Sequence, residues 1–293
     1  RSADGSAEER RMSSLERISW RRTLALALLC SLVATVRAAA EDPSLQLYLD
    51  FEYYEPVWQH RSWVFHDNSP NGLDAELHNM GDLLALVPGK FGNALQVSTT
   101  NGGYVRTDGL SLYAHDEGVT VSMWARLLGK GFHYPFYVAN GDFNDRSVTA
   151  FLARSEGQDG TGSISMGWRA YQEDRETLAF RSGASTELTR EWVHFAGVYD
   201  PDAELALVYI NGDEVDRADT DGDPISAWGA EGAASEVGIW FHHDDRENPL
   251  FVDELRLYSR ALKPDEISEL MQAPLSASAR GKLVISWAAL KGR

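Results

Sequence analysis

The sequence predicts an all-β protein, an antiparallel two-sheet jelly-roll sandwich with one short C-terminal helix. From Leu45 onward, short alternating or apolar runs follow one another and are separated by turns rich in Gly, Asn, Asp and Pro, which is the pattern of a sandwich. No internal repeat is visible, and strands do not alternate with helices. Both observations argue against a solenoid and against a parallel nucleotide-binding sheet.

Residues 1–40 have the pattern of an export signal, with a possible untranslated leader at their start. Arg21 and Arg22 precede an apolar run over 24–36, and three alanines end at Ala40, where a signal peptidase would cut. The run is shorter than the about 20 apolar residues that span a bilayer. We therefore expect a secreted, periplasmic or cell-envelope protein with no membrane insertion after cleavage. The expected organisation is a leader at 1–40, a jelly-roll domain at 41–272 and a C-terminal tail at 273–293.

The composition excludes several classes of partner. The chain carries 44 acidic residues against 27 Lys and Arg, a formal net charge of −17, and residues 1–40 hold more arginines than acids. Nucleic acids and anionic membrane surfaces are therefore not expected partners. The single cysteine, Cys30, lies in the leader, so the exported domain forms no disulfide. A cysteine-free secreted domain is typical of bacterial exported proteins.

The strands can be placed from their alternation and from the turns between them. The expected ranges are 46–52, 75–80, 94–98, 104–107, 118–127, 136–140, 148–153, 163–169, 178–181, 192–200, 204–210, 236–241 and 252–259. The run 118–127 has apolar residues on both faces, which indicates a central strand. Turn sequences at 201–203 and 211–212 predict two successive hairpins around 204–210.

The closing strand and the helix after it carry the clearest local signals. Alternation over 251–258 puts Asp253 on the face of Phe251 and Leu255. A buried unpaired carboxylate is costly, so Asp253 must have a partner. The next segment, 263–272, has a proline and two acids in its first turn and apolar residues at helical spacing. It predicts a short helix packed against a sheet.

Several polar and aromatic residues are expected to have structural roles. Asp67 begins an Asx-type turn, and its carboxylate would cap that turn. Trp124 and Trp192 are interpreted as core aromatics, since large rings dominate sandwich cores. His194 lies on a strand between apolar neighbours, which favours a hydrogen-bonded structural histidine.

Several phrases occur in order along residues 45–272. They are LYLDFE at 47–52, DNSPNGLDAEL at 67–77, PGKFGNAL at 88–95, GVTVSMWARL at 118–127, EWVHFAGVYD at 191–200, LALVYINGDEV at 205–215 and FVDELRLYSRAL at 251–262. Together they resemble the laminin-G-like jelly-roll family, which has the fold of concanavalin A-like lectins and glucanases. The resemblance implies a two-sheet sandwich of the bacterial secreted type, often with a structural calcium, that serves as a binding module for glycans or for other proteins.

The calcium implied by the resemblance has candidate ligands. Asn93 and Asp253 each share the parity of apolar neighbours, and the family places their segments close together. Asp50 and Glu52 on the first strand could add to a site for calcium, which takes about six to eight oxygens. The alternative is that Asp253 accepts backbone N–H bonds or pairs with a nearby arginine, Arg256 or Arg260.

The candidate ligand site is drawn from two predicted loops, 129–146 and 240–248. Exposed aromatic rings beside Asp, Asn and His suit a sugar, because a ring stacks on the apolar sugar face and the polar groups bind hydroxyls. The candidate residues are Tyr134, Tyr137, Asn140 and Asp142 from the first loop, and Trp240, His242, Asp244 and Arg246 from the second. The alternative is a pair of hydrated loops without a binding role.

Catalytic motifs are missing from the sequence. Glucanases on this fold use a Glu-x-Asp-x-(x)-Glu run, and no such run is found; nor is a Gly-x-Ser-x-Gly, a metalloprotease helix or a phosphate loop. The sequence therefore predicts an exported, non-catalytic binding module for extracellular carbohydrate. An adhesive or structural module that docks an extracellular protein is the alternative, followed by a glycoside hydrolase on the same fold.

Overall fold

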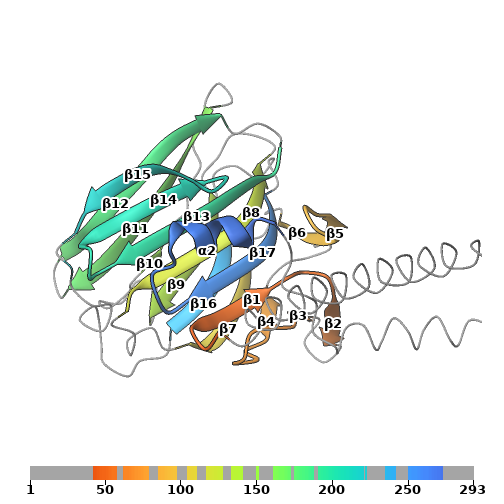
Figure 1. Ribbon diagram of the computed structural model, residues 1–293. Coiled ribbons are helices and arrows are strands. Elements are labelled where there is room, and N and C mark those ends of the chain that lie inside the picture. The colour runs from red at the N-terminus through yellow and green to blue at the C-terminus, as the bar shows by residue number, and fades with distance from the viewer. Residues whose placement is uncertain are drawn as a thin grey trace, which may run out of the picture. The chain divides into compact units, whose positions relative to one another are not determined.

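The predicted all-β architecture is confirmed by a computed structural model (Figure 1). It describes residues 42–57, 62–78, 85–97, 104–110, 117–127, 133–140, 150–151, 161–172, 175–187, 191–220, 222, 235–241 and 250–272. The strands form two large sheets and one small one, and their pairing is antiparallel throughout the described ranges. The leader at 1–40 and the tail at 273–293 lie outside the described residues.

The eight-stranded sheet has the order β15-β14-β13-β8-β17-β6-β5, with β1 paired to β17. Its strands are β1 (Leu45–Leu49), β5 (Ala85–Pro88), β6 (Asn93–Val97), β8 (Val119–Leu127), β13 (Val193–Asp200), β14 (Leu205–Ile210), β15 (Asp213–Asp219) and β17 (Leu250–Tyr258). Strand β8 lies between β13 and β17, which confirms the central position expected for it.

The six-stranded sheet has the order β2-β3-β4-β7-β16-β9. Its strands are β2 (Tyr54–Val57), β3 (Ser62–Phe65), β4 (Ala75–His78), β7 (Tyr104–Leu110), β9 (His133–Asn140) and β16 (Ser235–Phe241). A three-stranded sheet contains β10 (Ala150–Phe151), β11 (Thr161–Gln172) and β12 (Arg175–Glu187). Strands β2, β3, β5 and β15 were not among the ranges expected from the sequence.

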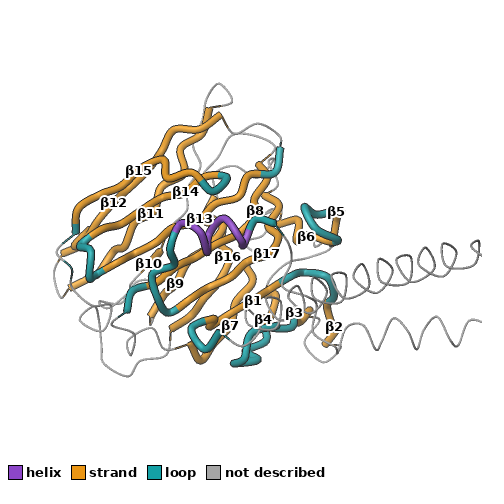
Figure 2. Tube along the Cα trace, viewed as in Figure 1, coloured by secondary structure: helices purple, strands orange, loops and turns teal. Residues whose placement is uncertain are grey.

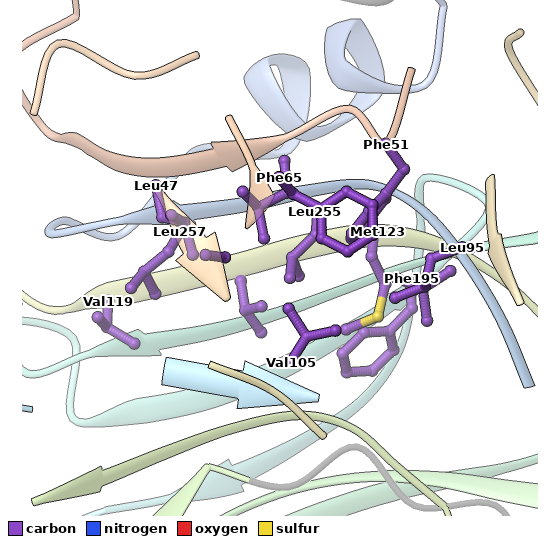
Figure 3. Packing of buried hydrophobic residues seen from close by; sticks show 14 of the residues in the cluster. Leu47, Phe51, Phe65, Leu95, Val105, Val119, Met123, Phe195, Leu255 and Leu257 are labelled. Carbon is purple, nitrogen blue, oxygen red and sulfur yellow. The ribbon is translucent and has the colours of Figure 1, made fainter. Parts of the chain in front are cut away.

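The main hydrophobic core contains buried side chains from both large sheets (Figure 3). The eight-stranded sheet contributes residues such as Leu47, Met123 and Leu255, and the six-stranded sheet contributes Phe65 and Val105. Each apolar side chain removed from water stabilises the fold by roughly 1.5–3 kcal/mol. This burial fixes the register of both sheets, because a slip of one residue would turn the apolar set outward.

The opposite face of the eight-stranded sheet is covered in part by helix α2 (Pro264–Leu270), drawn purple in Figure 2. Ile267 and Leu270 pack into a second buried cluster with Tyr48 and Tyr258. Glu266 starts the helix by accepting the backbone N–H of Lys263 at 2.8 Å, as in a capping box. The helix expected over 263–272 is confirmed, with a shorter extent.

A bulge in β17 overturns one expectation about Asp253. Asp253 lies opposite Trp124, but Arg256 lies opposite Ser122, so β17 contains one extra residue at this point. Glu254 adopts a φ of +54° there. The bulge shifts the alternation, and Leu255 therefore enters the sandwich core instead of sharing the face of Asp253, as regular alternation predicted.

The two hairpins expected around 204–210 are confirmed. Strand β14 pairs with β13 on one side and with β15 on the other. Asn211 and Gly212 have φ values of +52° and +84°, the left-handed pair that a tight hairpin turn needs. Across the described ranges, no helix is long and apolar enough to cross a membrane.

Candidate functional site

The turn that begins at Asp67 organises one end of the six-stranded sheet. The Asp67 carboxylate accepts the backbone N–H groups of Tyr48, Ser69 and Leu73, each at 2.8 Å. This confirms the capping role expected for Asp67. The backbone N–H of Asp67 in turn donates to Oδ1 of Asp74 at 3.0 Å, so the turn also fixes the Asp74 side chain.

Asp74 belongs to an exposed aromatic and acidic cluster that we call the Tyr53 platform, made of Tyr53, Glu55, His66 and Asp74. The ring of Tyr53 is 52% exposed and lies nearly parallel to the His66 imidazole, at 16° with 6.2 Å between ring centroids. The imidazole lies between two carboxylates: Nδ1 is 3.2 Å from Asp74 and Nε2 is 3.4 Å from Glu55.

The register of the sheet explains why these residues meet. Tyr54 lies opposite Phe65, and Phe65 lies opposite Ala75. The residues next in line, Tyr53, His66 and Asp74, therefore form one row on the other face of the sheet. Since Phe65 and Ala75 point into the sandwich core, the Tyr53 platform lies on the outward face of the six-stranded sheet.

A second row of register partners crosses the whole sheet beside the first. It runs through Glu55, Val64, Glu76, Arg106, Gly238 and Tyr137, which are successive register partners. The row connects the Tyr53 platform, at the β2 edge, to strand β9 at the opposite edge. Neighbouring strands lie about 4.8 Å apart, so the row has the length of an oligosaccharide rather than of a single sugar ring.

Several of the sequence-predicted ligand residues lie in the same sheet. Residues 133–140 form a strand, so Tyr134, Tyr137 and Asn140 belong to β9 and not to a loop. Trp240 lies in β16 directly opposite Tyr134. The remaining candidates lie outside the described residues, and they are Asp142, His242, Asp244 and Arg246.

The predicted metal residues surround the turn between β5 and β6. Oδ2 of Asp253 accepts the backbone N–H groups of Lys90 and Phe91 at 2.8 and 2.9 Å. Glu52 accepts the backbone N–H of Asn93 at 3.0 Å, and its carbonyl oxygen accepts the Asn93 side-chain amide at 3.1 Å. The structure thus brings three of the four candidates together.

The fourth metal candidate, Asp50, touches this group only through the backbone. Its Oδ1 accepts the N–H of Glu52 at 3.1 Å. Burial raises the pKa of both Asp50 and Glu52, and the Asp50 carboxylate adds to the rise in the pKa of Glu52.

Asp253 is the most deeply buried carboxylate of the group. Burial raises its pKa to about 7, and the neighbouring Glu254 adds to the rise, while the N–H groups of Phe91 and Lys90 oppose it. Its Oδ1 atom is buried with no hydrogen-bond partner in the described part of the chain.

Asp253 was expected to need a partner, and the backbone N–H groups of Lys90 and Phe91 are that partner. The two candidate arginines pair elsewhere, Arg256 with Glu254 and Arg260 with Glu266. Oδ1 of Asp253 is left for a cation, but no cluster of three or more His, Cys, Asp or Glu side chains within the described ranges could hold a metal. Calcium binding therefore stays a prediction.

A buried polar network continues from Asp253 across the same face of the eight-stranded sheet. Glu254 contacts Arg256 and accepts the hydroxyl of Tyr48 at 2.8 Å. His194 lies 3.0 Å from the hydroxyl of Ser122. Burial, with the nearby Arg256 guanidinium, lowers the pKa of His194 to about 3, so this histidine is neutral and structural, as expected.

Trp124 is buried, as expected of a core aromatic, but neither Trp124 nor Trp192 belongs to the cluster between the two large sheets. Trp124 is in the row of Asp253 and His194, and the Lys90 ammonium lies 4.1 Å from its ring centroid. Trp192 is half-buried, and its ring centroid lies 6.5 Å from that of Phe251. Both rings belong to the other face of the eight-stranded sheet, because the alternation of β8 and β13 gives the core-facing positions to smaller apolar residues.

The Tyr53 platform was not among the sites expected from the sequence. Regular alternation groups Tyr53 with the buried Phe51, but Phe51 has a φ of +53°, and this irregularity separates the two side chains. The pair Tyr53-Tyr54 before a glutamate and a proline was the available signal, since one ring of two adjacent aromatics must face away from the core.

Residues 99–268, more than half of the chain, match the Laminin_G_3 family, described as the concanavalin A-like lectin/glucanases superfamily. The chain belongs to this family. No curated protein matches the sequence.

Solved structures with the same fold include two of interest. Domain 4 of AbnA, a GH43 extracellular arabinanase from Geobacillus stearothermophilus, was solved in complex with arabinotriose; it is 22% identical, with a TM-score of 0.52, over 78% of this chain and 98% of that one. The botulinum neurotoxin serotype C1 binding domain is 14% identical, with a TM-score of 0.51, over 80% of this chain and 53% of that one. The chain thus spans about half of the neurotoxin domain. At these identities the likeness shows the fold alone.

Proposed function

We propose that this family member is a non-catalytic carbohydrate-binding module whose ligand lies along the outward face of the six-stranded sheet. The observation that carries the proposal is the exposed Tyr53 ring, held nearly parallel to the His66 ring and flanked by two carboxylates. A sugar needs such a flat apolar ring beside polar groups that bind its hydroxyls. The stacking on His66 also orders the ring before binding, which lowers the entropy cost of association.

Two further observations support an extended ligand. The row of register partners from Glu55 to Tyr137 crosses all six strands, and Trp240 and Tyr134 are register partners in the same sheet. An arabinanase domain of the same fold was solved with arabinotriose, and binding of an oligosaccharide by the present chain is proposed in line with it. Export to the cell surface or medium, expected from residues 1–40, is part of the proposal, because extracellular polysaccharide is the ligand class in question.

The test is isothermal titration of the protein with neutral oligosaccharides, arabinotriose first. Tyr53→Ala should weaken binding about tenfold, which corresponds to about 1.4 kcal/mol, whereas Tyr53→Phe should retain most of the affinity. Val215→Ala on β15 is the matched control, since Val215 is also exposed, at 42%, but lies in the other large sheet. Release of reducing ends should not occur.

Two results would contradict the proposal. The first is binding that Tyr53→Ala leaves unchanged, because the ligand would then lie elsewhere. The second is the absence of binding to any oligosaccharide, which would favour the alternative of a protein-docking module.

A further inference from the structure

The charge around Tyr53 bears on which sugars the site can take. The two carboxylates of the Tyr53 platform face a single imidazole, so the platform is negative whether or not His66 is protonated. Both acids are accessible: the side chains of Glu55 and Asp74 are 59% and 45% exposed. Each contributes one oxygen to the imidazole. The second oxygen of Asp74 also accepts the backbone N–H of Asp67, but a carboxylate oxygen can accept more than one hydrogen bond, so acceptor positions remain for a ligand.

The aromatic ring, like the two carboxylates, favours a positively charged ligand. The face of a tyrosine ring attracts a cation through its quadrupole, and the ring of Tyr53 is exposed beside both carboxylates. A ligand carboxylate placed against this ring would lie near Glu55 and Asp74 and would be repelled. An ammonium group would gain from the ring and from both acids.

We propose that the Tyr53 platform selects sugars that carry an amino group, such as glucosamine oligomers, and rejects acidic sugars. This inference rests on the proposed function and deepens it. The row of register partners next to the platform holds Glu55 and Glu76 with a single guanidinium, Arg106. The formal net charge of −17 acts in the same direction at longer range.

The experiment uses ligands that differ mainly in charge. The dissociation constants of a glucosamine tetramer, an N-acetylglucosamine tetramer and a galacturonate tetramer are measured by titration of the protein at low salt. We expect the glucosamine tetramer to bind at least about fivefold more tightly than its acetylated counterpart, and the galacturonate tetramer to bind most weakly. The preference should shrink at about 1 M salt, where the screening length falls to about 3 Å.

Charge-neutral variants test whether the platform causes the preference. Glu55→Gln with Asp74→Asn should remove the difference between the two tetramers while retaining binding of the acetylated one. Glu55→Gln alone, at an exposed position, should reduce it partly and does not disturb the Asp67 turn. Asp202→Asn, in an exposed turn of the eight-stranded sheet, removes one charge elsewhere and should leave the preference unchanged.

The outcomes separate the two proposals. If no sugar binds, the proposed function fails. If neutral or acidic tetramers bind as tightly as the glucosamine tetramer, with a dependence on Tyr53, the proposed function stands and the selection of amino sugars is overturned. If a tetralysine peptide binds as tightly as the glucosamine tetramer and Tyr53→Ala affects neither, the site is a general cation surface and the inference is again overturned.

Discussion

The Oδ2 atom of Asp253 accepts the backbone N–H of Phe91 at 2.9 Å, and this contact ties the closing strand β17 to the turn between β5 and β6. The adjacent N–H of Lys90 donates to the same oxygen. One carboxylate therefore satisfies two part-buried backbone donors of this turn, and the turn depends on it.

Replacement of Asp253 should destabilise the fold. Asp253→Ala leaves two backbone N–H groups without an acceptor, at a cost of about 1–3 kcal/mol each, so the free energy of unfolding should fall by at least about 2 kcal/mol. Urea denaturation measures the change. Asp202→Ala, in an exposed turn, should change the stability by less than about 0.5 kcal/mol; a similar loss in both variants would show that Asp253 has no special role.

The pH dependence of stability follows from the same residue. Burial raises the pKa of Asp253 to about 7, so the folded protein holds this proton over a range where the unfolded chain, with a pKa of about 3.9, has lost it. The stabilising contribution is complete below that value and is lost as the pH rises through about 7.

The measurement is the urea midpoint between about pH 5 and pH 8. The midpoint should fall as the pH rises. The free energy of unfolding derived from it should fall by at most about 1.4 kcal/mol per pH unit because of this group. Asp253→Asn, which cannot ionise, should flatten the curve. An equally steep curve in this variant would assign the effect to Glu254, whose pKa burial also raises.

A pair of glycines separates steric conflict from backbone strain. Gly92 has a φ of +55°, and a Cβ there would lie 1.9 Å from Oε1 of Glu52, whereas Gly72 has a φ of +61° with nothing within 4 Å. The left-handed backbone lowers the stability of both alanine variants, but only Gly92→Ala must also displace the Glu52 side chain. We expect its melting temperature to fall several degrees below that of Gly72→Ala; equal values would mean that Glu52 moves without cost.

The calcium predicted from the family resemblance can be tested by thermal melting. Binding to the folded state alone would raise the melting temperature by several degrees in excess calcium, and a chelator would reverse the rise. The shift should disappear in Asp253→Asn, because this variant removes the negative charge beside Oδ1 of Asp253, a buried acceptor without a partner in the described ranges. If calcium leaves the melting temperature unchanged, the calcium prediction is wrong, and the role of Asp253 is to accept the two backbone N–H groups.

Local patterns predicted much of the fold, and irregular backbone limited the rest. The hairpins at Asn211 and Pro201, the central strand β8 and helix α2 followed from turn chemistry, alternation and helical spacing, which are local properties. The face of Leu255 and the exposure of Tyr53 did not, because each depends on a neighbouring residue with positive φ, Glu254 and Phe51. Glutamate and phenylalanine rarely adopt a positive φ, so neither irregularity could be recognised from the residue type.

The candidate site was harder to predict than the fold. The sequence identified aromatic residues that the structure places in β9 and β16, and it identified the acids around Asp253. The Tyr53 platform combines residues from three strands, and alternation within any one of them does not show that they meet. The groups that donate to Asp253 were likewise backbone N–H groups of a distant turn, which no side-chain pattern reveals.

Strand β17 is the last strand of the chain described and yet lies in the middle of its sheet, with β8, β6 and β1 as neighbours. A chain emerging from the ribosome therefore lacks the element that joins its first strand to the rest until almost all of the domain has been made. Its pairings span long stretches of sequence, which slows folding and leaves unpaired strand edges exposed in the meantime. Such a nascent chain has a prolonged need for chaperone protection.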